Sequence, residues 1–236
     1  MANNIATNTW SQVANRETIV LLLPIGSCEQ HGPHLPLDTD TQIAQYLCVH
    51  AAQQDSRILI APSLTISASG EHAGFPGTLS IGTEALTQVL IEIVRSADWS
   101  NGVVFVNGHG GNADAVYGAT RTLTSEHRNV AAWWPRIEHG DAHAGASETS
   151  MMLVINPEQV NMAKAEAGST QPISEISAQL RSGGVRAVST NGVLGDPTTA
   201  TFEHGHNLLS QLTRDLVTFI NEHMNQRTNE PHNSQP

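Results

Sequence analysis

Carboxylate and imidazole side chains crowd the loop that follows the apolar run at residues 19–25. Glu29, His31 and Asp40 stand in this loop, together with two prolines and a glycine. Such a rigid polar loop is poor core material, whereas carboxylates and imidazoles are common ligands of Zn²⁺, Mn²⁺ and Fe(II). A metal site here predicts a hydrolase, because a bound cation lowers the pKa of water toward neutrality.

Two further polar clusters follow apolar runs later in the chain. The first, at residues 107–112, contains His109, and the second, at residues 141–149, contains His143 and Glu148. If the runs before them are parallel strands, all these clusters lie beyond the carboxyl ends of one sheet, where open α/β sheets bind ligands. Oxygen and nitrogen ligands without nearby thiol pairs disfavour a Cys-rich structural zinc site.

Each of these residues also has an ordinary structural interpretation. Glu29 and His31 fit an exposed loop pair, and Asp38 or Asp40 fits a helix cap, which is a common use of Asp. The recurrence of such clusters after successive expected strands favours a shared site over coincidence. Asp40 can serve as both a cap and a ligand.

Residues 108–113 also fit the pattern G-x-G-x-x-A between an expected strand and an expected helix. This pattern raises an alternative from another class, a dinucleotide-binding oxidoreductase. However, it follows the third expected strand rather than the first, and no acidic residue clearly ends the next strand to bind a ribose. A nucleotide site would also leave Glu29, His31 and Asp40 unexplained, so we favour the metal site.

Apolar runs of strand length alternate with amphipathic segments along the chain. The continuous apolar character of the runs predicts parallel strands that are buried on both faces. Asp40 or Thr39 is expected to cap the first helix, and Thr83 the second. Residues 148–154 fit a helix or a strand, and residues 174–184 are ambiguous. The expected strands are 18–24, 57–61, 102–106 and 130–134, and the expected helices are 40–52, 83–97, 112–126 and 204–226.

This alternation predicts an α/β fold with a mainly parallel central sheet covered on both faces. No linker or internal repeat divides the 236 residues. We therefore expect a polar segment at residues 1–16, a single domain at residues 17–226 and a disordered tail at residues 227–236.

The composition excludes several classes of partner. A formal net charge of −11 disfavours nucleic acid and anionic membrane surfaces, which both need basic patches. No apolar run approaches the roughly 20 residues of a membrane span, and the first ten residues lack a signal pattern. Cys28 and Cys48 alone do not form a disulfide framework. We expect a cytoplasmic protein without nucleic-acid or membrane partners.

Ordered motifs throughout the chain resemble those of the creatininase (creatinine amidohydrolase) family. The resemblance runs from about residue 19 to the C-terminal helix. It implies a three-layer α/β/α sandwich, a metal-dependent hydrolase of C–N amide bonds, and a homo-oligomer. The motifs are residues 29–32 with Asp40, residues 107–112, residues 143–145 with residues 148–149, and residues 192–197.

The resemblance also implies two divalent metal ions per subunit, with Zn, Fe(II) and Mn as candidates. Glu29 and His109 would bind one ion, His31 would bind the other, and Asp40 would bridge them. Creatinine-hydrolysing members have a Glu two residues after the histidine that matches His109. This chain has Gly111 at that position. The departure predicts that Glu148 supplies the missing carboxylate or that the second ion binds more weakly, and it disfavours creatinine as substrate.

Roles in amide hydrolysis follow from these assignments. The backbone amides of Gly110 and Gly111, at an expected helix start, would stabilise an oxyanion. His143 would protonate the leaving nitrogen or stabilise the tetrahedral intermediate, and its alternative role is to orient Glu148. Residues 69–72 are the further stretch expected to reach the site, because the adjacent residues 74–77 resemble a rigid flap.

Several segments look closer to one branch of that family, which cleaves a radical-modified precursor peptide in mycofactocin biosynthesis. Its substrate would be the modified C-terminus of that peptide, from which a unit derived from Val and Tyr is released. A small cyclic or formylated amide is the alternative substrate within the same chemistry. The segments are residues 33–41, 69–72, 77–86, 104–112 and 192–201.

Overall fold

A parallel sheet forms the centre of the protein in the computed structural model, which describes residues 3–224. Its order is β2-β1-β3-β4, so the first strand in the chain lies inside the sheet. Leu22 of β1 is aligned with Ile60 of β2 and with Val104 of β3. The strands are β1 (Val20–Ile25), β2 (Ile58–Ile60), β3 (Gly102–Asn107) and β4 (Val130–Trp133).

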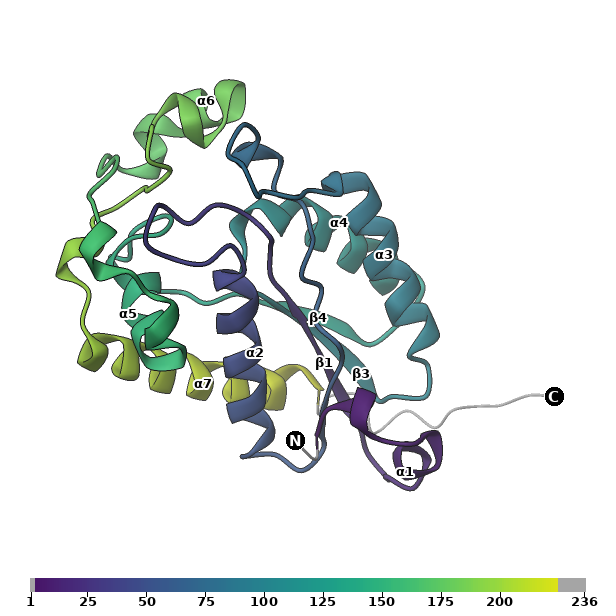
Figure 1. Ribbon diagram of the computed structural model, residues 1–236. Coiled ribbons are helices and arrows are strands. Elements are labelled where there is room, and N and C mark those ends of the chain that lie inside the picture. Colours follow the sequence, from purple (N-terminus) through teal and green to yellow (C-terminus); the bar gives the residue numbers. More distant parts are fainter. Residues whose placement is uncertain (1–2, 225–236) are drawn as a thin grey trace.

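Helices cover both faces of this sheet and produce the predicted three-layer α/β/α sandwich (Figure 1). One apolar layer packs α2, α5 and α7 against the sheet, and the other packs α3 and α4. The short α1 and α6 lie outside the two layers (Figure 1). The helices are α1 (Trp10–Ala14), α2 (Thr39–Ala52), α3 (Gly82–Ser96), α4 (Ala113–Ser125), α5 (Ala146–Ile155), α6 (Ile173–Gly183) and α7 (Phe202–Met224).

The alternation of side chains along β1 explains why this strand is apolar without interruption. Val20 and Leu22 belong to the layer beneath α2 and α7, whereas Leu21 and Leu23 belong to the layer beneath α3 and α4. All residues of β1 and of β3 are buried. A strand with helices on both faces has no solvent-facing side, so polar residues are absent until its carboxyl end.

The expected strands and helices are all present, with ends that differ by a few residues. The two uncertain segments are helices: α5 contains residues 148–154, and α6 contains nearly all of residues 174–184. The expected final helix reached residue 226, and its last two positions, like the expected tail at 227–236, lie outside the described residues. Within residues 3–224, no helix combines the length and apolarity that a membrane crossing requires.

The predicted helix caps are wrong. The helix α2 starts at Thr39, with Asp38 at its N-cap position and no side-chain cap hydrogen bond. Asp40 does not cap because its carboxylate accepts a hydrogen bond from Ser27 Oγ at 2.9 Å and faces histidines instead. The helix α3 starts at Gly82, so Thr83 lies inside it; Ile81 precedes the helix and makes no side-chain cap.

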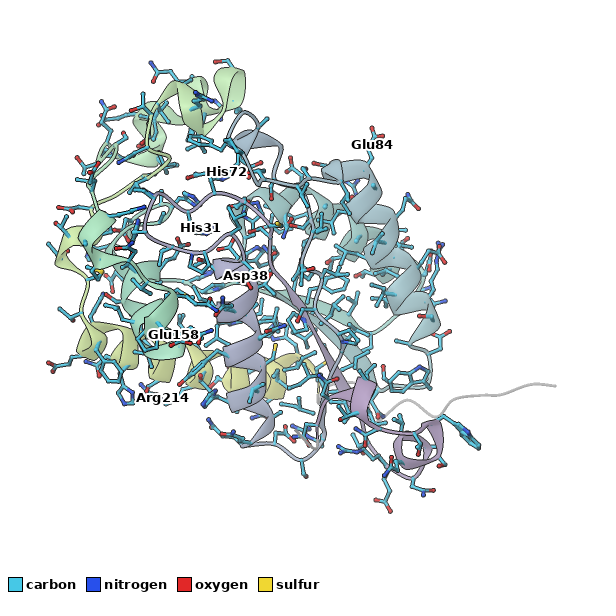
Figure 2. The ribbon with its side chains drawn as sticks, viewed as in Figure 1. His31, Asp38, His72, Glu84, Glu158 and Arg214 are labelled. Atoms are coloured by element: carbon cyan, nitrogen blue, oxygen red, sulfur yellow. The ribbon has the colours of Figure 1, made fainter. Side chains whose placement is uncertain are left out.

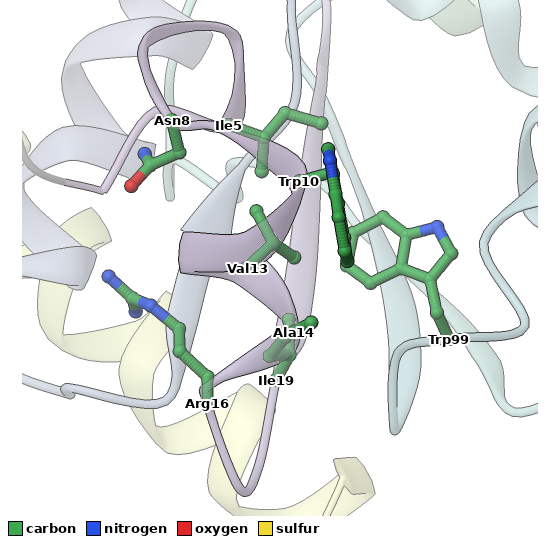
Figure 3. A pocket seen from close by; sticks show the side chains of 8 residues that line it. All are labelled: Ile5, Asn8, Trp10, Val13, Ala14, Arg16, Ile19 and Trp99. Atoms are coloured by element: carbon green, nitrogen blue, oxygen red, sulfur yellow. The ribbon is translucent and has the colours of Figure 1, made fainter.

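An apolar pocket of about 360 Å³ lies near the amino end of β1 (Figure 3). Its walls include Trp10 of α1, Trp99 and Ile19, which directly precedes the strand. Figure 3 shows Trp10 and Trp99 among the side chains that line the pocket. The acid and imidazole clusters are at the opposite, carboxyl ends of the strands, so this pocket is not where they act.

Candidate metal centre

The loops at the carboxyl ends of the strands bring a group of acid and imidazole side chains together. The loop after β1 supplies Glu29 and His31, and the first turn of α2 supplies Asp40. The segment after β3 supplies His109, the segment that leads into α5 supplies His143, and the first turn of α5 supplies Glu148. Donor atoms of these residues lie within 4.8 Å of one another in overlapping groups of three: Glu29, His31 and His143; Glu29, Asp40 and His109; and His31, Asp40 and Glu148.

A short 3-10 helix at Gly70–His72 adds two side chains to this centre. Glu71 and His72 form another group with Glu29, again with donor atoms within 4.8 Å. Figure 2 shows His72 and His31 on the side of the molecule where the loops gather, and the ring centre of His143 lies 4.5 Å from that of His72 and 4.3 Å from that of His31. The sequence indicated residues 69–72 as a stretch that reaches the site, but it gave no role to Glu71.

Asp40 lies between two histidines. Its Oδ1 is 3.1 Å from His31 Nε2, and its Oδ2 is 3.2 Å from His109 Nδ1. The side chain is 2% exposed, so solvent does little to screen its charge. A carboxylate with one oxygen on each side suits a bridge between two cations, each held by one of the histidines.

Backbone carbonyl groups fix which nitrogen of His31 faces Asp40. His31 Nδ1 lies 3.1 Å from the carbonyl oxygen of Glu29, which can only accept a hydrogen bond, so Nδ1 carries the hydrogen. In the neutral ring, Nε2 then carries no hydrogen and has a free lone pair. It faces Asp40 and, at 3.9 Å, Glu148 Oε2. This arrangement is typical of a metal-binding histidine whose second nitrogen is held by the backbone.

In His109 the two ring nitrogens have the opposite roles to those in His31. Its Nε2 donates to the carbonyl oxygen of Ala68 at 3.0 Å, which leaves Nδ1 facing Asp40 Oδ2. In a neutral ring two lone pairs would therefore meet at 3.2 Å. A proton or a cation between Nδ1 and the carboxylate removes that repulsion.

Glu29 gives the clearest sign that the donor set fits a cation. The residue is completely buried, and neither carboxylate oxygen has a hydrogen-bond partner among the described residues. Nitrogens of His72 and His109 approach to 3.2 and 3.0 Å, but they do not meet hydrogen-bond geometry. A buried carboxylate without donors costs several kcal/mol unless a charge compensates it. A divalent cation would supply that compensation.

The raised pKa values of two groups also indicate that negative charge at this centre lacks a compensating cation. Burial lowers the pKa of His31, but the charge and hydrogen bond of Asp40 outweigh it and raise that pKa to about 10. Burial, aided by the charge of Asp40, raises the pKa of Glu148 to about 7. In the metal-free protein, protons on these groups reduce the negative charge. A bound cation would displace those protons.

Gln30 fixes the orientation of two further histidines. Its Oε1 accepts from the backbone amide of Gly32 at 2.9 Å, so its Nε2 must donate, and it lies 2.9 Å from His72 Nδ1. The hydrogen of neutral His72 is therefore on Nε2, which lies 3.2 Å from Glu29 Oε1 without meeting hydrogen-bond geometry. His143 Nε2 donates to the carbonyl oxygen of Gln30 at 2.9 Å. This leaves His143 Nδ1 unprotonated and 3.8 Å from Glu29 Oε1.

The remaining predicted residues also lie at this centre. Glu148 Oε2 accepts from the backbone amide of Ala144 at 2.6 Å, which ties the start of α5 to the site. Gly110 and Gly111 begin the 3-10 helix Gly110–Asn112, directly after His109. The sequence motifs gave no role to Gln30 or to Glu71. Gln30 stands between two predicted ligands, which was the one signal available for it.

Comparison with known proteins agrees with the fold and with the resemblance described above. The model of the creatininase family, described as creatinine amidohydrolase, matches residues 6–220. A Mycolicibacterium smegmatis protein named mycofactocin precursor peptide peptidase is 46% identical over 225 residues, covering 92% of this chain and 90% of that protein. A Mycobacterium ulcerans protein of the same name is 47% identical over 225 residues, with the same coverage.

Solved structures of creatininases share the fold. One that is described as creatininase Mn has a TM-score of 0.79 at 22% identity and covers 94% of this chain and 99% of that chain. Another, described as the Zn-Zn type of a mutant creatininase, has a TM-score of 0.79 at 23% identity and covers 94% of this chain and 98% of that chain. These descriptions name manganese and zinc as metals of those proteins.

Proposed function

The chain belongs to the creatininase family, and from this premise we propose that it hydrolyses an amide bond of a modified precursor peptide with a metal-activated water. The observation that carries the proposal is the position of Asp40. Each of its oxygens faces a different histidine, and a backbone carbonyl fixes the other nitrogen of each ring. Family membership and the peptidase relatives support a hydrolase of C–N amide bonds.

Two metal positions account for the donor atoms. His31 Nε2, Asp40 Oδ1 and Glu148 would hold one ion. His109 Nδ1, Asp40 Oδ2 and Glu29 would hold the other. Oxygen and imidazole donors suit Zn, Fe(II) and Mn alike. When bound, such ions lower the pKa of water toward neutrality and polarise the scissile carbonyl.

His143 is the proposed proton carrier. Burial, with the nearby charges of His31 and His72, lowers its pKa well below the usual value, so the ring is neutral at pH 7. Because Gln30 O holds Nε2–H, the free Nδ1 can accept a proton during attack and pass it to the leaving nitrogen. An orienting role toward Glu148 is less favoured, because Glu148 already accepts from Ala144 N.

The backbone amides of Gly110 and Gly111 are the proposed donors to the oxyanion. They belong to the turn that joins His109 to α4, beside the groups that would hold the metal. Space for a substrate at Gly110 is consistent with this role, because a Cβ there would meet no atom within 4 Å. Donors fixed in place before the reaction stabilise developing negative charge without reorganisation.

The substrate assignment depends on the relatives that share 46% and 47% identity over 92% of this chain. We propose that the enzyme releases the C-terminal unit derived from Val and Tyr from the modified mycofactocin precursor. Gly111 in place of a Glu separates this chain from creatinine-hydrolysing members and disfavours creatinine. Homo-oligomeric assembly and a cytoplasmic location complete the proposal.

Mass spectrometry of the modified precursor tests the function directly. The purified protein is incubated with the precursor and with Zn²⁺, Mn²⁺ or Fe²⁺, and a chelator-treated sample serves as the control. We expect loss of the C-terminal fragment only where metal is present. An intact precursor with every metal, together with turnover of creatinine or of a formylaminopyrimidine, would reject the peptidase assignment.

A further inference from the structure

Glu71 meets the edge of His109 that faces away from Asp40. Its Oε1 lies 3.2 Å from His109 Nε2, and its side chain is 32% exposed, so the residue reaches the site from its solvent-facing rim. It arrives from the 3-10 helix Gly70–His72, far in sequence from the loops that supply the proposed ligands. Neither the motifs nor the proposed metal positions give this carboxylate a role.

The surroundings of His109 Nε2 show which role is open to Glu71. The polar contacts of this nitrogen among residues 3–224 are all with oxygen atoms: the Ala68 carbonyl at 3.0 Å, Glu29 Oε2 at 3.0 Å and Glu71 Oε1 at 3.2 Å. A backbone carbonyl can only accept, so Nε2 carries a hydrogen, which it donates to Ala68. The Glu71 carboxylate lies beside this N–H at ion-pair distance. Nδ1, on the other edge of the ring, is the nitrogen left for a metal.

Gly111 provides the space that Glu71 occupies. A Cβ at position 111 would overlap Glu71 Oε1 and His109 Nε2, and it would lie 2.7 Å from the Ala68 carbonyl oxygen. Contacts with a Cβ below 3.0 Å essentially do not occur. Any side chain at position 111 would therefore displace the Glu71 carboxylate. The glycine that departs from the pattern of creatinine-hydrolysing members is the residue that admits Glu71.

We propose that Glu71 is a positioning residue whose carboxylate attracts the N–H of His109 Nε2, 3.2 Å away, and thereby aims His109 Nδ1 at a divalent metal ion. The inference rests on the proposed function, because it assumes that His109 binds a metal. A carboxylate–histidine–metal arrangement of this kind fixes the ring and makes the ligating nitrogen more basic. The Glu71 carboxylate occupies the space that a side chain at position 111 would fill. In this role it is not itself a ligand of either ion.

Zinc affinity tests this role independently of turnover. Affinity is measured by competition with a chromophoric chelator, and the number of ions bound at saturation is measured by elemental analysis. Loss of an outer-shell partner typically costs 10- to 100-fold in metal affinity. We expect Glu71→Ala to weaken binding at one position by about that factor with unchanged ions per chain. Glu71→Gln should weaken binding less, because its amide oxygen keeps a partial negative charge beside the N–H of His109 Nε2.

The control for the lost charge is Glu84→Gln. Glu84 lies in the first turn of α3 and projects into solvent away from the loops that gather the site (Figure 2). Its substitution removes the same formal charge and should leave zinc affinity unchanged. Thermal unfolding of each metal-free variant checks that Glu71 is not merely structural, since its replacement should leave the folded state intact.

The space at Gly111 provides a second, independent perturbation. Gly111→Ala removes no donor but pushes against Glu71 and His109, so it should weaken zinc binding. Gly118→Ala, in α4, is the matched control, because a Cβ there would come no closer than 3.6 Å to Thr87, an ordinary contact, and zinc affinity should be retained. Equal effects of the two substitutions would show that the space at position 111 is not used by Glu71.

The outcomes separate this inference from the proposed function. A native protein that binds no divalent metal contradicts the proposed function itself. If both Glu71 variants bind zinc with the affinity of the native protein, the positioning role is wrong but the proposed function still stands. Loss of one ion per chain at saturation, equal in Glu71→Ala and Glu71→Gln, also overturns it, because that result makes Glu71 a direct ligand.

Discussion

Replacement of Asp40 by Asn tests the bridging carboxylate most severely. The change keeps the shape of the side chain but removes the charge that lies 3.1 Å from His31 Nε2 and 3.2 Å from His109 Nδ1. Unit charges about 4 Å apart interact by about 4 kcal/mol at an effective dielectric constant of 20. Because the ions are divalent, this is a lower bound, and at about 1.4 kcal/mol per factor of ten the affinity for each ion should fall by at least about a thousandfold.

The assay for this variant is metal content after dialysis, followed by chelator competition and precursor cleavage. Asp38→Asn is the control, since Asp38 is exposed, lies two residues away and contacts Gln42 rather than a histidine (Figure 2). Asp40→Asn should lose both ions and cleavage, whereas Asp38→Asn should keep them. Full metal content and a full rate in Asp40→Asn would refute the bridging role.

Three further predictions follow from the same structure. His143→Ala should keep metal but lose cleavage; loss of metal as well would make His143 a ligand. Because the pKa of His31 is raised to about 10, its protonated form stabilises the metal-free protein fully below about pH 6.5, and this contribution is lost as the pH rises through 10. Denaturant unfolding with chelator present should show that loss, and a His31→Gln variant with the same pH dependence would contradict it. Leu22→Ala, at a side chain with 0% exposure, should lower the free energy of unfolding by about 2–5 kcal/mol; a change below about 1 kcal/mol would contradict its central place in the core.

The fold was accessible from sequence because the sheet is buried on both faces. A strand such as β1, with all its residues buried, must be apolar throughout, and helices with one buried face show helical spacing. The segments that were uncertain have weaker patterns. The helix α5 is polar in its first half and apolar in its second, and it buries residues of both kinds against α2 and α7. Its sequence therefore lacks the contrast between two faces that marks a helix.

The helix caps were mispredicted because capping preferences depend on neighbouring residues in the sequence and do not include contacts with distant residues in the folded protein. Asp40 stands where a cap is expected, but His31 and His109 approach it from other loops and hold its carboxylate. Its neighbour Asp38 takes the N-cap position without a capping hydrogen bond. A strong cap preference was therefore overridden by charges that only folding brings together.

The candidate ligands were visible in the sequence, whereas their supporting residues were not. Glu29, His31 and His109 follow strand ends, and the parallel topology places those ends at one edge of the sheet. Gln30 and Glu71 act through contacts with histidines that lie far from them along the chain. No periodicity or motif encodes such contacts, so they appear only in three dimensions.

Anomalous X-ray diffraction from crystals of the metal-loaded protein tests the central claim most directly. Data collected at the absorption edge of the bound metal should show two peaks, one on each side of Asp40, at about 2.0–2.2 Å from its oxygens. One peak should lie beside His31 Nε2 and the other beside His109 Nδ1. A folded, active enzyme with no peak at Asp40, or with its metal elsewhere, would contradict the account.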